Sequence, residues 1–109
     1  MATTYKVLGQ SNPSATTATT LYTCPSATET VISSLVVANQ AGTSGTYRIA
    51  IRPNGASLAN QHYIVYDATL AANTTTAYTL GMTIDATDVV TVYASSANFS
   101  FNAFGSEIA

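Results

Sequence analysis

Apolar and polar residues alternate along much of this chain, and that alternation limits the folds it can adopt. In residues 46–52, aromatic and isoleucine side chains occupy every second position, and two arginines are among the alternating residues. Residues 88–94 and 98–104 show the same period of two, and the first of these is rich in valine. Successive side chains of a strand point to opposite faces of a sheet, so this pattern predicts β-strands with one buried face. No stretch shows a helical period.

Shorter segments of the same kind predict further strands, at 5–8, 20–23, 29–38, 62–66 and 76–80. Turn-forming residues fill the connections at 39–45, 67–75 and 81–88, and Pro53-Asn54-Gly55 ends the strand at 46–52. About seven or eight short strands at this spacing predict an antiparallel β-sandwich, immunoglobulin-like or jelly-roll-like, with a small barrel as the alternative. The 109 residues fit one domain, 1–109, with residues 11–20 as a Ser/Thr/Ala-rich loop.

Charged residues make up only 7% of the sequence, against about 25% in ordinary soluble domains. The net charge is −2 and only three residues are basic, which argues against binding to nucleic acid or to an anionic membrane. No apolar run approaches the length of a membrane span, and the N-terminus lacks the pattern of a secretory signal. A surface so poor in charge is typical of an extracellular protein or of one that packs beside copies of itself.

The residues that could do chemistry are few and scattered. Cys24 is the only cysteine, so we expect a small buried residue rather than a disulfide or a metal ligand. Asp85 and Asp88 are the only close pair of acids, and we expect them to cap the backbone of a turn. The sequence therefore predicts no catalytic residues, no metal and no cofactor. A small enzyme would have to use the single histidine, His62, with Asp67 or Asp85.

One face of two predicted strands is more apolar and aromatic than a free surface needs. If Tyr63 and Val65 face inward, the side chains on either side of them face outward, and the arginines of 46–52 share a face of a neighbouring strand. Tyrosine and arginine are enriched in the centres of protein interfaces. We therefore predict a protein–protein interface formed by Arg48, Arg52, His62, Ile64 and Tyr66, with cross-strand pairing within the sheet as the alternative explanation of this row.

Four segments together resemble small virion structural proteins of tailed phages, particularly marine and cyanobacterial ones: residues 1–10, 59–67, 85–95 and 98–105. The resemblance runs nearly end to end, but it carries no catalytic motif. It implies a non-enzymatic subunit that forms homo-oligomers, contacts other virion proteins, and decorates the capsid or belongs to the neck or tail. It also implies assembly in the host cytoplasm and release in the virion by lysis.

The alternative function is a module that binds glycans or proteins of the host surface. Its contacts would come from loops at one end of the sandwich, and the connections at 39–45 and 67–75 are the candidates.

Overall fold

The computed structural model describes residues 2–109 and is built from nine strands. The strands are β1 (Thr3–Ser11), β2 (Thr19–Thr23), β3 (Glu29–Asn39), β4 (Gly45–Arg52), β5 (Tyr63–Leu70), β6 (Thr75–Tyr78), β7 (Met82–Ile84), β8 (Val89–Ala94) and β9 (Phe99–Ile108). Two short 3-10 turns, η1 (Pro53–Gly55) and η2 (Asn60–His62), lie between β4 and β5.

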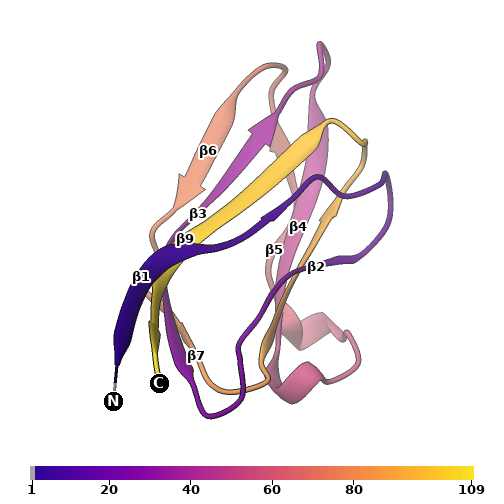
Figure 1. Cartoon of the computed structure of the whole chain (residues 1–109). Helices are drawn as coiled ribbons and strands as arrows, with labels where there is room; N and C mark the ends of the chain where they lie inside the picture. The colour runs from indigo at the N-terminus through magenta and orange to yellow at the C-terminus, as the bar shows by residue number, and fades with distance from the viewer. Residues whose placement is uncertain (1) are drawn as a thin grey trace.

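The strands form two antiparallel sheets that face one another (Figure 1). Sheet A has the order β1-β9-β3-β6, with β7 also paired to β3, and sheet B has the order β2-β8-β4-β5. Strands β6 and β7 pair with successive parts of β3 and act as one interrupted strand. The first strand then pairs with the last, the second with the one before the last, and so on inward, which is jelly-roll connectivity. The predicted antiparallel sandwich is confirmed.

The core lies between the sheets and is built by the alternation seen in the sequence. Phe99 and Phe101 of β9 are fully buried, and both rings contact Tyr47 of β4, with ring centroids 6.0 and 6.3 Å apart. Ile49 of β4 and Val92 of β8 are also fully buried. Each such side chain contributes about 1.5–3 kcal/mol relative to exposure, so these central strands supply much of the stability.

Two glycines allow backbones to approach more closely than any other residue would. A Cβ atom on Gly105 of β9 would lie 1.9 Å from the carbonyl oxygen of Val31, where β3 bulges against β9. A Cβ atom on Gly9 would lie 2.2 Å from the carbonyl oxygen of Leu21, where β1 of sheet A crosses the start of sheet B. From Gly9 back towards the N-terminus, β1 lies beside β9, and the backbones of Ala2 and Ala109 exchange two 2.9 Å hydrogen bonds. Figure 1 shows both chain ends at this end of sheet A.

The structure corrects several predicted boundaries. Strand β5 continues to Leu70, whereas residues 67–75 were predicted to form a connection. The predicted connection at 81–88 contains β7, a strand of only three residues. The predicted loop at 11–20 is shorter and spans residues 12–18, where Asn12 Nδ2 donates to the carbonyl oxygens of Ala97 and Phe99.

Candidate functional site: the outer face of sheet B

The outer face of sheet B carries a cluster of aromatic and charged side chains that is unusual for this chain. We call it the tyrosine–arginine platform and define it as Arg48 of β4, Tyr63, Tyr66 and Asp67 of β5, and Tyr93 of β8. Arg48 and Tyr93 are cross-strand partners, so they lie on the same side of the sheet, opposite to the core residues Ile49 and Val92. The platform gathers two of the chain's eight charged residues.

Arg48 is held at the centre of this platform. Its guanidinium carbon lies 4.3 Å from the ring centroid of Tyr66 and 4.3 Å from that of Tyr93. Its Nε and Nη2 atoms donate to the two carboxylate oxygens of Asp67 at 2.6 and 3.2 Å. The Arg48 guanidinium lowers the pKa of Asp67, and that carboxylate in turn raises the pKa of Arg48. A bidentate pair stacked between two rings fixes the orientation of all three partners.

The irregular pairing of β5 brings its tyrosines to one face. Tyr63 pairs with Ala50 and Val65 with Ile49, so Ile64 is an extra residue that bulges from the strand. A second irregularity follows at Asp67, whose φ of 51° lies in the left-handed region. Because these bulges break the strict alternation, Tyr63 and Tyr66 come into edge-to-face contact at 4.9 Å and 81°. The sequence prediction placed Tyr63 inward, and this was wrong.

A hollow of about 410 Å³ opens beside the platform and is lined by Asn60, Tyr63 and Tyr66. Asn60 is the first residue of η2, and His62 is the last. The backbone N–H of Ala59 donates to His62 Nδ1 at 3.1 Å, and the N–H of His62 donates to the Ala59 carbonyl oxygen at 3.1 Å. These two bonds close the turn and set the position of Asn60.

The structure places the residues of the predicted interface in different surroundings. Arg48 and Tyr66 lie together in the platform, and Ile64 beside them is 44% exposed. Arg52 shares their face but donates to Thr91 Oγ1 and to the carbonyl oxygens of Gly55 and Ala56, so it braces η1. His62 was predicted to face outward from a strand; it is buried in η2 instead, because its ring accepts a bond within that turn. Tyr63 and Tyr93, which lie in the platform beside Tyr66 and Arg48, were not among the predicted interface residues.

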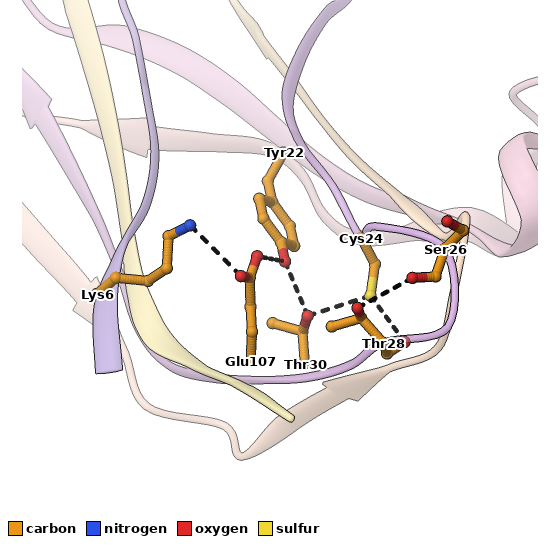
Figure 2. Close-up of polar contacts among 7 residues, drawn as sticks. All are labelled: Lys6, Tyr22, Cys24, Ser26, Thr28, Thr30 and Glu107. Carbon is orange, nitrogen blue, oxygen red and sulfur yellow. Dashed lines mark hydrogen bonds and ion pairs between the residues drawn. The ribbon is translucent and has the colours of Figure 1, made fainter. Parts of the chain in front are cut away.

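A second polar cluster lies between the sheets at the end where the termini meet (Figure 2). The Tyr22 hydroxyl donates to Glu107 Oε2 at 2.5 Å and lies 2.8 Å from Thr30 Oγ1. Lys6 Nζ approaches Glu107 Oε1 at 3.4 Å, and the buried Cys24 thiol donates to the Thr28 carbonyl oxygen. Burial raises the pKa of Tyr22, and the bond to Glu107 raises it further. Each polar group here has a protein partner, so we interpret the cluster as a structural link between the two sheets.

The acidic residues form no candidate metal centre within residues 2–109, where no group of at least three His, Cys, Asp or Glu side chains could hold an ion. Asp88 instead accepts hydrogen bonds from the backbone N–H groups of Asn54 and Asp85, both at 2.8 Å. Asp85 Oδ1 accepts a bond from the N–H of Ala86. The predicted capping role of this pair is confirmed.

The outer face of sheet A has a different character. The register of β1, β9 and β3 places Tyr5, Val7, Phe104 and Ser34 on it, and Glu29 at one end is its only charged residue among residues 2–109. Tyr5 is 84% exposed, Val7 48% and Phe104 37%. Val7 and Phe104 are direct cross-strand partners, and Tyr5 is two residues along β1. This end of sheet A is therefore a partly apolar surface with one charged residue, Glu29, beside a free strand edge.

Comparison of the chain with protein-family models, with curated proteins and with solved structures finds no match. Among residues 2–109, no helix has the length and apolar character needed to cross a membrane.

Proposed function

We propose that this protein is a non-enzymatic structural subunit of a tailed-phage virion, which forms homo-oligomers and docks on other virion proteins. Its place is the capsid surface, as a decoration subunit, or the neck or tail, as an accessory subunit. It acts through protein–protein contacts and is released with the particle by lysis. The resemblance of its segments to small virion proteins motivates the proposal. Jelly rolls are common in viral capsid proteins, which supports it as an analogy of fold.

The observation that carries the proposal is the exposed end of sheet A. Residues Thr3–Val7 of β1 are exposed, and one edge of this strand pairs with β9 while the other is free. An edge strand is a template for pairing with another chain unless charges, prolines or bulges protect it. Lys6 is the only charged residue in β1, and its side chain is directed to Glu107. The register shift of β1 lies between Val7 and Gly9, beyond the exposed segment Thr3–Val7. A neighbouring subunit that adds to this edge would also cover Tyr5, Val7 and Phe104.

The energetic gain from covering this surface is substantial. Full burial of a side chain such as Val or Phe contributes about 1.5–3 kcal/mol, and the three residues are contiguous. Glu29 is the one charged residue that the register places on this face among residues 2–109, so a partner would have to remove water from few ionised groups there. The low charge of the whole chain has the same consequence, since copies do not repel one another strongly.

The experiment is the solution mass of the purified protein, measured by size exclusion with light scattering. We expect a closed oligomer such as a trimer, pentamer or hexamer, because most homo-oligomers have closed symmetry. Tyr5→Lys should dissociate it by placing an unpaired charge in the contact. Thr20→Lys, on the exposed outer side of edge strand β2, is the matched control and should leave the mass unchanged. A wild-type chain that stays monomeric at high concentration would contradict the proposal.

A further inference from the structure

We infer that the hollow lined by Asn60, Tyr63 and Tyr66 is a binding site for one sugar ring of a neutral carbohydrate. The site lies on the outer face of sheet B, and the proposed assembly surface lies on the outer face of sheet A. The inference therefore does not depend on the proposed function. The volume of the hollow, about 410 Å³, falls in the range of small-molecule sites, about 300–1,000 Å³.

The walls of the hollow match the two-sided character of a pyranose. One face of such a ring presents C–H bonds, which are polarised positively and pack against the electron-rich face or flank of an aromatic ring. Tyr66 is 58% exposed although the Arg48 guanidinium lies over its ring, so much of this residue is in contact with water. Tyr63 meets it edge to face, at an interplanar angle of 81°, so the two rings form an angled wall.

The rim supplies the groups that sugar hydroxyls need. A hydroxyl group both donates and accepts, and Asn60, which lines the hollow, carries an amide donor and a carbonyl acceptor in its side chain. The phenolic hydroxyl groups of the tyrosines can do both as well. No buried side-chain N or O atom within residues 2–109 lacks a partner, so any polar group here that is free of protein bonds faces solvent.

Charge selects against other ligands. The one cation beside the hollow, Arg48, is neutralised by the carboxylate of Asp67 in a bidentate pair. A phosphate or an acidic peptide would have to compete with Asp67 for the guanidinium, and an ammonium group would meet the guanidinium itself. The lining residues are uncharged, so an uncharged polyhydroxyl ligand is the complementary one.

The site is organised before a ligand arrives. Stacking of Arg48 fixes Tyr66, and contact with Tyr66 in turn fixes Tyr63. The ring of His62 closes η2 and so sets Asn60. Ordering of mobile side chains costs about 0.5–1.5 kcal/mol for each one, and a preformed site avoids most of that cost.

The test titrates the 15N-labelled full chain with neutral oligosaccharides ending in glucose, galactose, mannose or N-acetylglucosamine, and with a sialylated one. We expect at least one neutral sugar to shift the amide signals of Asn60, Tyr63 and Tyr66 in a saturable way. Tyr66→Ala should weaken that binding at least about tenfold, and Asn60→Ala should weaken it without touching the stacked rings. Tyr66→Phe should keep most of it, because the ring remains.

The matched control is Tyr5→Ala, which removes a still more exposed tyrosine, 84% against 58% for Tyr66, from the opposite face and should leave sugar affinity unchanged. Circular dichroism of each variant shows whether the fold is retained. Three results would overturn the inference: no saturable shift with any neutral sugar, binding that survives in both Tyr66→Ala and Asn60→Ala, or shifts with the sialylated sugar alone. Shifts that map to β1 and β9 would place the ligand on the other face and overturn it as well.

Discussion

The hydroxyl group of Tyr22 lies in a chain of polar side chains that links β2 to both neighbouring strands of sheet A (Figure 2). Its single proton goes to Glu107, so Thr30 must donate to the Tyr22 oxygen, and the Cys24 thiol then donates to Thr30 or Thr28. Such a network is stable only when every member is satisfied. It holds the two sheets together where the hydrophobic core ends.

Tyr22 should make the stability of the protein sensitive to alkaline pH. Its pKa is raised by burial and by Glu107, so the fold favours the protonated phenol. The stabilisation is complete below the ordinary pKa of about 10 and is lost as the pH rises beyond it. Tyr22→Phe should lower the free energy of unfolding at neutral pH by about 1 kcal/mol and flatten its decline above pH 10. Urea unfolding across this range measures both effects.

The exposed variant Tyr5→Phe serves as the control and should leave the neutral-pH stability unchanged. Equal slopes above pH 10 for wild type and Tyr22→Phe would refute the assignment.

Single residues differ in how far the sequence predicts their roles. Cys24 was predicted to be a small buried residue, and its burial as a free thiol confirms this. The prediction succeeds because an unpaired cysteine usually behaves as a small apolar side chain. Its polar partners Thr28 and Thr30 lie only four and six residues further along the chain, but the alternation of apolar and polar residues does not show that their oxygens contact the thiol. His62 was misplaced because alternation was extended one residue beyond the true start of β5.

At the scale of elements, strict alternation predicts well and irregular pairing does not. Strands β4, β8 and β9 lie within one or two residues of their predicted starts, because each buries every second side chain against the other sheet. Strand β5 contains two register shifts, and each moves the following side chains to the other face. Bulges depend on the partner strand, so the platform that they create could not be predicted from residues 62–66 alone.

The turn between β7 and β8 depends on one carboxylate. Asp88 accepts backbone hydrogen bonds from Asn54 in η1 and from Asp85, so it joins two loops. Asp88→Ala should lower the free energy of unfolding by about 1–2 kcal/mol, a typical cost of removing a capping side chain. Asp85→Ala is the control, because its carboxylate bonds only to the adjacent Ala86, and it should cost less. Thermal unfolding compares the two, and an equal or larger loss in Asp85→Ala would contradict this account.

The whole molecule presents two outer faces of opposite chemistry. The sequence predicts that a surface with so few charges serves contact, but composition does not reveal how the charges are distributed. The fold concentrates Arg48, Asp67 and Arg52 on sheet B and leaves the outer face of sheet A almost without charge. The interface predicted from the sequence, at Arg48, Arg52, His62, Ile64 and Tyr66, stays a prediction, although His62 is buried. The proposals above place assembly on sheet A and ligand binding on sheet B instead.

If assembly uses sheet A and ligand binding uses sheet B, mutations should abolish one function without affecting the other. Tyr5→Lys should abolish the oligomer and leave the sugar-dependent amide shifts intact, whereas Tyr66→Ala should abolish the shifts and leave the solution mass intact. The double variant should show both losses without further interaction, because substitutions on opposite faces share no partners and such effects add. Light scattering and amide titration on the same four proteins measure this. If Tyr66→Ala alone dissociates the oligomer, the platform is itself the subunit interface, as the sequence pattern first indicated.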